Sequence, residues 1–423
     1  MDGTVNVLVT GGTGFFGHNL VSALLKDARV ANVHVLARNA PPTENTLSRW
    51  AVDGRCMIGH PPEPSKPEER IPQSNGANAV FASDRVRFFR GDINDADVLA
   101  EAMDECAVVF HACGDTRWWN AVNDEQKRTN VKGTATALRA ANAASHVKCF
   151  VYTSTVDVMG HYDKDYYANI NDDTVVAIDG ALDETLPCPE HFERSSAIYE
   201  SHTPQYYSYQ GFGYNYADTK RDAEHYVLSA AHRSDLRVVV IRPGSMIGPW
   251  DVSDQYGRLF EELKARSLAG IPSGGTSVCH VTDVARAHIV AAFAPQLKHQ
   301  VYICAGANVS YHELFLAMRA MLVEFRDSDH NLATPIGGVC GGALQIIPQP
   351  LLVLYGWLCE VHSCVWSGSE PEVNPGLARY MSCNAYYSSA RAEGELGYPA
   401  QRPRRWLEAI VESYYWYTFR GRF

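Results

Sequence analysis

TGGTGFFG, residues 10–17, lies between an apolar run and a segment with helical periodicity. The run Val5–Val9 is short, rich in valine and followed by glycines, which is typical of a buried parallel strand. After the glycines, apolar residues recur at helical spacing within Leu20–Leu25. A strand, a glycine turn and a helix in this order indicate a βα unit that binds a dinucleotide.

The glycines of this turn have separate expected roles. Gly11 permits the tight turn, Gly14 lets the backbone approach a pyrophosphate, and Gly17 lets the helix pack closely on the strand. The following helix N-terminus supplies free N–H groups and the positive end of a dipole. The alternative is a glycine-rich turn that holds no ligand. The residues predicted to contact the dinucleotide here are Gly11, Gly14, Phe15, Phe16 and Gly17.

The end of the second predicted strand bears on the choice of coenzyme. Val33–Ala37 is followed by Arg38, and no acid stands at Ala37. An acid near this point would hold the 2′-hydroxyl of NAD, whereas an arginine suits the 2′-phosphate of NADP. We therefore expect NADP or NAD with a slight preference for NADP, the alternative being that Arg38 is an ordinary surface residue.

Tyr216 and Lys220 form a candidate proton-transfer pair. They lie four residues apart in a segment with helical periodicity, so they share one helix face. A free tyrosine titrates near pH ~10, and a nearby ammonium favours the phenolate and lowers that pKa. The third member should be a hydroxyl where the fifth strand ends, in the run Thr153-Ser154-Thr155. We choose Thr155, with Ser154 second; the alternative is that these hydroxyls only cap backbone groups.

Strands and helices alternate along the first half of the chain, which predicts an α/β fold with a Rossmann-type doubly wound parallel sheet. Residues 1–242 are predicted to form the dinucleotide-binding domain, with polar, weakly periodic insertions at 40–83 and 161–213. Residues 243–423 are expected to form a smaller mixed α/β C-terminal substrate lobe, interleaved with the first domain. The further predicted strands are 86–90, 107–112, 149–153 and 237–242, and the further predicted helices are 97–103, 130–144 and 216–229.

Composition excludes several classes of protein. The formal net charge of −11 argues against nucleic acid as a partner, because phosphate binding needs a basic face. Eleven cysteines occur without a CxxC pair, which favours reduced thiols in the cytoplasm. We expect no secretory signal peptide, because the first strand begins at Val5. We also expect no metal: His111, His280 and His288 are interpreted as packing or loop histidines.

One late segment has an apolar character that allows three interpretations. Residues 339–365 contain LLVLYGWLC but are interrupted by prolines, glutamines and a glutamate. The segment could be a helix in the core of the second lobe, an interfacial membrane anchor or a membrane-spanning helix.

Several motifs, taken as an ordered set, resemble the extended branch of the short-chain dehydrogenase/reductase family. The set includes the glycine turn at 10–17 and the Tyr216/Lys220 pair. Its other members are Gly91-Asp92-Ile93, His111-Ala112-Cys113, Asn130–Thr134, Arg242-Pro243 and His280–His288. The late segments Pro375–Tyr380 and Ala392–Tyr398 are similar to those of the 3β-hydroxysteroid dehydrogenase and sterol-4α-carboxylate 3-dehydrogenase group.

This resemblance implies roles for further residues. Asp92 and Ile93 would lie beside the adenine, Ala112 would approach the coenzyme, and Pro243 would face the nicotinamide. Tyr216, Lys220 and Thr155 would be the catalytic group, and Tyr216 and Lys220 would also contact the coenzyme, with Lys220 donating to the nicotinamide ribose.

The resemblance also implies an activity. The expected function is NAD(P)-dependent interconversion of a secondary alcohol and a ketone on a small, hydrophobic, steroid-like substrate. The alternatives are an NADPH-dependent ketone or aldehyde reductase of the dihydroflavonol-reductase type, and a sugar-nucleotide epimerase or dehydratase. Peripheral contact with the cytosolic face of the endoplasmic reticulum membrane and a homodimer are further expectations.

Overall fold

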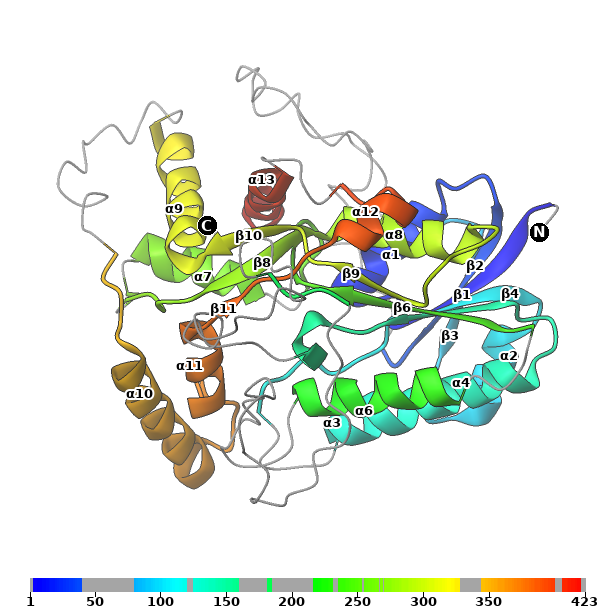
Figure 1. The fold of residues 1–423 in the computed structure, drawn as a ribbon, viewed down its shortest axis with the longest axis horizontal. Helices are drawn as coiled ribbons and strands as arrows, with labels where there is room; N and C mark the ends of the chain where they lie inside the picture. Colours follow the sequence, from blue (N-terminus) through cyan, green and yellow to red (C-terminus); the bar gives the residue numbers. More distant parts are fainter. Residues whose placement is uncertain are drawn as a thin grey trace, which may run out of the picture.

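The computed structural model shows two sheets, with most helices packed on the faces of the larger one (Figure 1). The residues that the structure describes are 3–39, 80–119, 125–159, 181–184, 216–230, 235–252, 255–265, 267–268, 270–327, 344–399 and 405–419. The predicted insertion 161–213 therefore lies outside the described residues except at 181–184, and the insertion 40–83 lies outside them except at 80–83.

The larger sheet has the order β3-β2-β1-β4-β5-β6-β9 within the described chain, and all its neighbours are parallel. The strand order reverses between β1 and β4, and ligands of such sheets bind at the carboxyl ends of the strands beside this point. The predicted doubly wound sheet is thus confirmed. Its strands are β1 Val5–Thr10, β2 Val30–Ala37, β3 Val86–Arg90, β4 Cys106–His111, β5 Cys149–Thr153, β6 Arg237–Pro243 and β9 Val301–Cys304.

Alternation along the strands separates two hydrophobic layers. Val7 and Val9 of β1 enter one cluster with Leu20, whereas Leu8 enters the other with Leu99. All five side chains are inaccessible to solvent. The first layer is covered by α1 Phe15–Leu24, α8 Val281–Phe293 and α12 Ala390–Leu396, and the second by α2 Ala96–Met103, α4 Thr134–Ala143 and α6 Tyr216–Ser229. The two helix layers lie on opposite sides of the sheet in Figure 1.

The smaller sheet surrounds β8, which pairs with β10, β11 and β7. Its cluster is rich in aromatic residues, with Phe260, Trp416 and Tyr417 almost fully buried. β9 belongs to the larger sheet although it follows β8 in the chain, and the division at residue 242 stays a prediction. The elements of this part are β7 Ser245–Ile247, α7 Gln255–Ala265, β8 Gly275–His280, β10 Ala307–Ser310, α9 Tyr311–Asp327, α10 Gln349–His362, α11 Pro375–Ser382, β11 Asn384–Ala385 and α13 Arg405–Phe419.

The helix predicted at 130–144 has a more complex form. A short α3, Glu125–Lys127, passes into a π-helical segment η2, Arg128–Gly133, and then into α4. Such π segments often occur at functional sites. After β5, a 3-10 turn η3 covers Val156–Met159.

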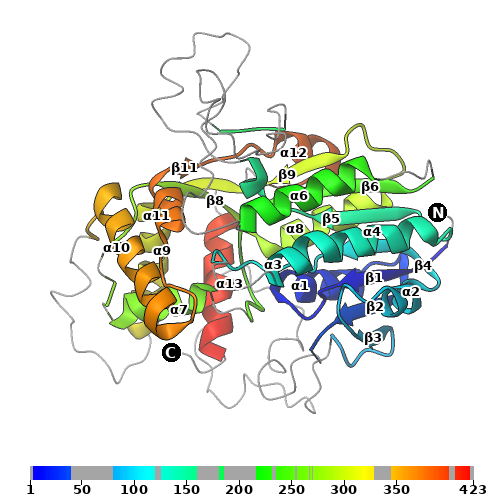
Figure 2. The same cartoon turned by 90° about the horizontal axis from the view of Figure 1, so that it is seen from below.

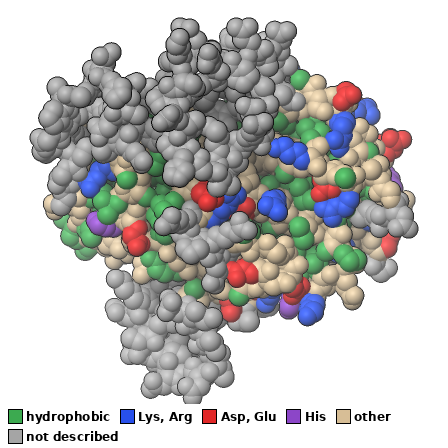
Figure 3. All heavy atoms as spheres, turned by 90° about the horizontal axis from the view of Figure 1, so that it is seen from above, with side chains coloured by type: hydrophobic (Ala, Val, Ile, Leu, Met, Phe, Trp, Pro, Cys, Tyr) green, Lys and Arg blue, Asp and Glu red, His purple; other side chains and the backbone are tan. Residues whose placement is uncertain are grey.

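The surface seen in Figure 3 mixes the two signs of charge. Where its atoms are described, Lys and Arg side chains are interspersed with Asp and Glu, and no extended patch of one sign covers that face. Such a face does not offer the basic surface that a nucleic acid needs.

Candidate active site

The glycine turn brings the ends of β1 and β4 into contact. Gly11 has φ of +71°, a left-handed conformation that favours glycine. A Cβ on Gly11 would lie 2.8 Å from Cys113 Cα, so a side chain there would strike the backbone that follows β4. Ala112 immediately precedes Cys113, and the predicted residues Gly11 and Ala112 therefore lie side by side at the point where the strand order reverses.

The start of α1 has backbone donors that suit an anion. Gly14 is the N-cap of α1, and no side chain caps it. A Cβ on Gly17 would lie 2.1 Å from Gly11 O, so only glycine permits this approach of helix to turn. The N–H groups at such a helix start can bind phosphate oxygens. This glycine cradle fits a pyrophosphate, and NAD(P) would be held here.

The two phenylalanines of the turn have different environments. Phe16 is buried, and its ring centroid lies 4.6 Å from that of His288, so its side chain belongs to the core. Phe15 is only partly buried. The predicted contact of Phe16 with the coenzyme is therefore limited to its backbone, which lies in the first turn of α1.

The residues predicted near the adenine end are placed on neighbouring segments. Arg38 follows β2, is half exposed and forms an ion pair with Glu125, with Nη1 3.0 Å from Oε1. Asp92 accepts a hydrogen bond from the backbone N–H of Asn94 at 2.9 Å. Ile93 is buried beneath Gly133, where an added Cβ would meet the isoleucine side chain at 2.5 Å.

The helix α6 begins at the predicted proton-transfer pair. Tyr216 and Lys220 are both buried, and they lie one helical turn apart. Lys220 Nζ donates a hydrogen bond to Thr153 O at 2.7 Å, which ties α6 to the end of β5. Burial lowers the pKa of Lys220 to about 8. Burial also raises the pKa of Tyr216 well above its usual value, and the Asp157 carboxylate acts in the same direction.

Of the two hydroxyls considered after β5, only one interacts with Tyr216. The Thr155 hydroxyl contacts the Tyr216 phenol and opposes the upward shift of its pKa. Ser154 instead donates to Glu224. Glu224 also pairs with Arg242 in a fully buried ion pair, with Nε 3.2 Å from the carboxylate. Thr155 is therefore electrostatically linked to Tyr216, whereas Ser154 belongs to the network of Glu224 and Arg242.

Pro243 lies at the end of β6 and is buried. Its neighbour Arg242 takes part in the Glu224 pair, so β6 is anchored to α6 just before this proline. Pro243 ends β6 and Thr155 follows β5, and these strands are paired, with Thr153 in register with Ile241.

Two polar residues of the site were not singled out from the sequence as site residues. Asn130 lies in η2, accepts from the Asp115 N–H at 2.7 Å and donates to Thr219 Oγ1 at 2.9 Å. It joins the loop after β4 to α6. Asp157, in η3, lies beside Thr155 and Tyr216. Asn130 stands within the Asn130–Thr134 motif and Asp157 two residues after Thr155, but only the fold shows their contacts.

His111, which ends β4, packs in the core. His111 is buried and its two ring nitrogens lie 2.8 Å and 2.9 Å from the hydroxyls of Thr10 and Thr134. Both nitrogens are therefore occupied. Across the described ranges, no group of three His, Cys, Asp or Glu is arranged to hold a metal ion.

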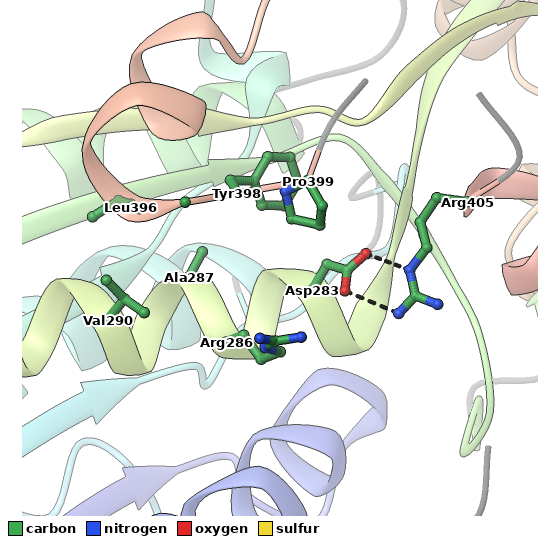
Figure 4. Close-up of a pocket in the computed structure, with 9 residues that line it drawn as sticks. Asp283, Arg286, Ala287, Val290, Leu396, Tyr398, Pro399 and Arg405 are labelled. Carbon is green, nitrogen blue, oxygen red and sulfur yellow. Dashed lines mark hydrogen bonds and ion pairs between the residues drawn. The ribbon is translucent and has the colours of Figure 1, made fainter. Parts of the chain in front are cut away.

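A separate cavity of about 200 Å³ lies beside α8 and the end of α12 (Figure 4). Asp283 at its wall binds Arg405 through two hydrogen bonds of 2.6 Å and 2.9 Å. Arg286 and Tyr398 also line it. None of the predicted site residues contributes to this cavity, so it is distinct from the Tyr216 site.

The chain is similar in sequence to a known protein family and to characterised enzymes. A sequence profile of the male sterility protein family matches residues 9–290. A putative dihydroflavonol 4-reductase from Synechocystis is 23% identical over 98% of this chain and 94% of its own length. A decarboxylating sterol-4α-carboxylate 3-dehydrogenase from Candida albicans is 23% identical over 93% of this chain and 92% of its length.

Solved structures show the same fold. The UDP-glucuronic acid 4-epimerase of Bacillus cereus, in complex with UDP-glucuronic acid and NAD, aligns with a TM-score of 0.61. The alignment covers 98% of this chain and 99% of the epimerase, at 17% identity. At that identity the likeness concerns the fold alone.

Proposed function

The chain belongs to the male sterility protein family, within the extended short-chain dehydrogenases/reductases, and we propose that it interconverts a secondary alcohol and a ketone on a hydrophobic, steroid-like substrate. It is an NAD(P)-dependent oxidoreductase that acts on CH–OH groups. The observation that carries the proposal is the buried group of Tyr216, Lys220 and Thr155 at the end of β5, on the side where the glycine turn lies. The sterol dehydrogenase from Candida albicans supports the substrate class.

Each residue of this group has a proposed task. A bound nicotinamide supplies the acceptor for the hydride that leaves the carbinol carbon. Tyr216, as phenolate, takes the hydroxyl proton, so that loss of hydride and proton converts the alcohol to a ketone. Lys220 favours the phenolate through its positive charge, and Thr155 holds the substrate oxygen.

Tyr216→Phe tests the assignment. We expect turnover to fall by at least about 10²-fold, because the proton acceptor is lost. The affinity for NADPH should stay within about twofold, since the phenol hydroxyl is not part of the glycine cradle. Absorbance of the reduced nicotinamide reports turnover in a screen of steroid and non-steroid alcohols and ketones with both coenzymes. Tyr226→Phe, on the same helix, is the matched control, and retained turnover in Tyr216→Phe would refute the role.

In a second candidate function, the same site catalyses the NADPH-dependent reduction of a ketone or aldehyde. Arg38 at the end of β2 and the dihydroflavonol-reductase relative favour it. NADP is also our proposed preference for coenzyme, because an arginine at this point can pair with a 2′-phosphate. The sugar-nucleotide alternative is supported by fold likeness alone.

We also propose that one face of α10 contacts a lipid surface, as a peripheral association. Leu351, Leu354, Leu358 and Val361 of α10, together with Val365 of the π-helical turn Ser363–Ser367 that continues it, recur at spacings of three and four residues and are each 46–63% exposed. Their helix lies at the edge of the molecule, against α11 (Figure 2). One stripe of α10 is thus apolar and uncovered by the described chain.

The chemistry of this stripe suits lipid. From Leu344 to Ser369 the chain has one formally charged side chain, Glu360, which is buried. Trp366, 72% exposed, continues the stripe with a residue type that is enriched at membrane interfaces. No helix in the described part of the chain is long and apolar enough to cross a membrane. The proposed contact is therefore with the surface, as for an interfacial helix.

Vesicle sedimentation tests this contact. Leu354→Ser with Leu358→Ser should lower binding to phosphatidylcholine vesicles by about 100-fold, because two leucine side chains that pass from water into lipid contribute about 3 kcal/mol. Leu228→Ser, an exposed leucine on α6, is the control. If the double variant changes the oligomeric mass and leaves vesicle binding unchanged, the face joins two copies and the lipid proposal is wrong. The predicted homodimer and the location at the endoplasmic reticulum stay predictions.

A further inference from the structure

Trp118, in the loop that follows β4, lies beside the proposed proton acceptor. Its ring centroid is 5.9 Å from that of Tyr216 and 5.0 Å from that of Tyr380 on α11. Trp118 is only partly buried, whereas Tyr216 is 9% exposed. Because so little of Tyr216 is open, a substrate that reaches its hydroxyl must pass the side chains that cover it. Trp118 is one of these side chains, so part of an apolar ring is accessible next to the reacting group.

The backbone of Trp118 is held by the C-terminal part of the chain. Glu370 Oε1 accepts from the Trp118 N–H at 3.0 Å, and Asn374 Nδ2 donates to the Trp118 carbonyl at 3.2 Å. The amide oxygen of Asn374 accepts from the N–H of Leu377 and caps α11. Both ends of the Asn374 amide are therefore in use, and they tie the Trp118 backbone to the start of α11.

The other side of the same loop is fixed to the helices that follow it. Asn130 in η2 accepts from the Asp115 N–H at 2.7 Å and donates to the Asp115 carbonyl at 2.9 Å. Gln126 in α3 donates to the carbonyls of Asp115 and Arg117. Hydrogen bonds on both sides restrict the loop, so it presents the indole of Trp118 as a fixed surface.

The polar and apolar parts of the site lie on different sides of Tyr216. The Thr155 hydroxyl follows β5, at the carboxyl ends of the strands. Trp118 lies on the α11 side, where it packs against an apolar cluster that contains Val156 and Tyr380. The polar side suits the oxygen of an alcohol or ketone. The indole suits the apolar rings that are attached to the reacting carbon, because an aromatic face offers a large flat apolar area.

We propose that Trp118 is a specificity-determining residue, whose indole forms an apolar wall of the substrate site and favours substrates with several fused rings over small ring alcohols. A fixed wall cannot close on a small ligand, which leaves part of the indole in water. A larger ligand covers the indole and gains affinity in proportion to the apolar area removed from water. The proposal rests on the proposed function, because it places the substrate against Tyr216. Glu370 and Asn374 are positioning residues, since they act through Trp118.

Trp118→Ala is tested with two alcohols that share the reacting ring. The probes are cyclohexanol and 3β-hydroxy-5α-androstan-17-one, each with the oxidised coenzyme. We expect kcat/KM to fall by about tenfold or more for the steroid alcohol and by less than about threefold for cyclohexanol, because only the steroid covers the lost ring. The loss should appear as a raised KM with little change in kcat, since the wall contacts substrate and transition state alike.

Two further variants complete this comparison. Trp118→Phe retains an aromatic ring and should restore most of the selectivity. Trp366→Ala, which removes an exposed tryptophan beyond α10, is the control and should leave both alcohols unaffected. If Trp118→Ala lowers kcat/KM equally for both alcohols, lowers kcat instead of raising KM, or changes neither constant, the proposal is wrong.

The positioning role of Glu370 is measured by the ratio of kcat/KM for the steroid alcohol to that for cyclohexanol. Glu370→Ala removes the acceptor of the Trp118 N–H and should lower this ratio by about threefold, the range for one hydrogen bond. Glu370→Gln retains an oxygen that accepts this hydrogen bond and should restore the ratio. A lower melting temperature with an unchanged ratio in Glu370→Ala would show that Glu370 does not position Trp118.

Indole fluorescence distinguishes failure of this proposal from failure of the proposed function. The emission that Trp118→Phe removes reports Trp118, and equilibrium dialysis measures binding of the same steroid alcohol to the complex with reduced coenzyme, which cannot react. If the steroid binds and changes this emission but no alcohol or ketone is turned over, the proposed function is wrong and the wall is supported. Binding that leaves the emission unchanged would overturn the wall, whether or not turnover occurs. If the steroid neither binds nor reacts, both the steroid class and the wall are wrong.

Discussion

Tyr216 and Lys220 experience opposite effects of the same burial. Burial disfavours the charged form of each group, so it raises the pKa of the phenol and lowers that of the lysine to about 8. At neutral pH the lysine is still mostly charged, whereas the phenol is protonated. Proton abstraction therefore needs a further positive charge beside Tyr216, and an oxidised nicotinamide carries one.

A substitution at Arg38 tests which coenzyme the protein prefers. Arg38→Asp should weaken NADPH binding by at least about tenfold, because a carboxylate repels the 2′-phosphate, and should leave NADH binding equal or tighter, since it can accept from the ribose hydroxyl. Nicotinamide fluorescence measures both affinities. Arg258→Asp, which makes the same charge change at an exposed position on α7, is the control. Equal affinities of the unaltered protein for both coenzymes would remove the basis for the preference.

Among the elements, α1 depends on glycine in a way that α12 does not. Both helices contain a glycine, but a Cβ on Gly17 would lie 2.1 Å from Gly11 O, whereas a Cβ on Gly394 meets nothing within 4 Å. The two positions therefore distinguish the general preference of helices for alanine over glycine from the steric need for glycine at the turn.

Gly17→Ala and Gly394→Ala should therefore change stability in opposite directions. We expect Gly17→Ala to cost about 1–3 kcal/mol or more, because the turn must open, and to abolish tight NADPH binding. Gly394→Ala should add up to about 1 kcal/mol and leave binding unchanged. Thermal unfolding and nicotinamide fluorescence measure the two effects. If Gly17→Ala bound NADPH normally, the close approach of helix and turn would not be needed for the site.

For the whole molecule, three buried histidines make stability depend on pH. Burial lowers the pKa of His18 and His111 to about 3 and that of His288 to about 4. The unfolded chain takes up these protons below its pKa near 6.5, whereas the folded chain does not. Protons thus bind the unfolded state preferentially between pH 6.5 and about 4, and the free energy of unfolding falls as the pH falls.

Each neutral buried histidine should contribute a slope of about 1.4 kcal/mol per pH unit in this range. Chemical denaturation between pH 7 and 5 measures the total slope. His18→Phe retains a ring against Trp250 and should remove one such contribution. His312→Phe, at an exposed position, should remove none. A slope that His18→Phe leaves unaltered would show that His18 is protonated in the folded protein.

Local sequence patterns were sufficient to predict the βα unit, the parallel strands and the helix that carries Tyr216 and Lys220, because each of these depends on residues close in sequence. Apolar alternation and the glycine spacing determine which segments form and which faces they bury. The helix predicted at 130–144 could not reveal its π segment, since the Asn130 contacts with Asp115 and Thr219 come from other segments.

Tertiary structure alone decided which partners the hydroxyls after β5 find. The sequence favoured Thr155 over Ser154, and in the fold Ser154 donates to Glu224 of the buried Glu224–Arg242 pair; the catalytic role of Thr155 stays a proposal. The link between Thr155, Asp157 and Tyr380 joins residues more than 220 positions apart. The direction of a hydroxyl depends on which donor and acceptor reach it, and those partners are set by packing rather than by spacing along the chain.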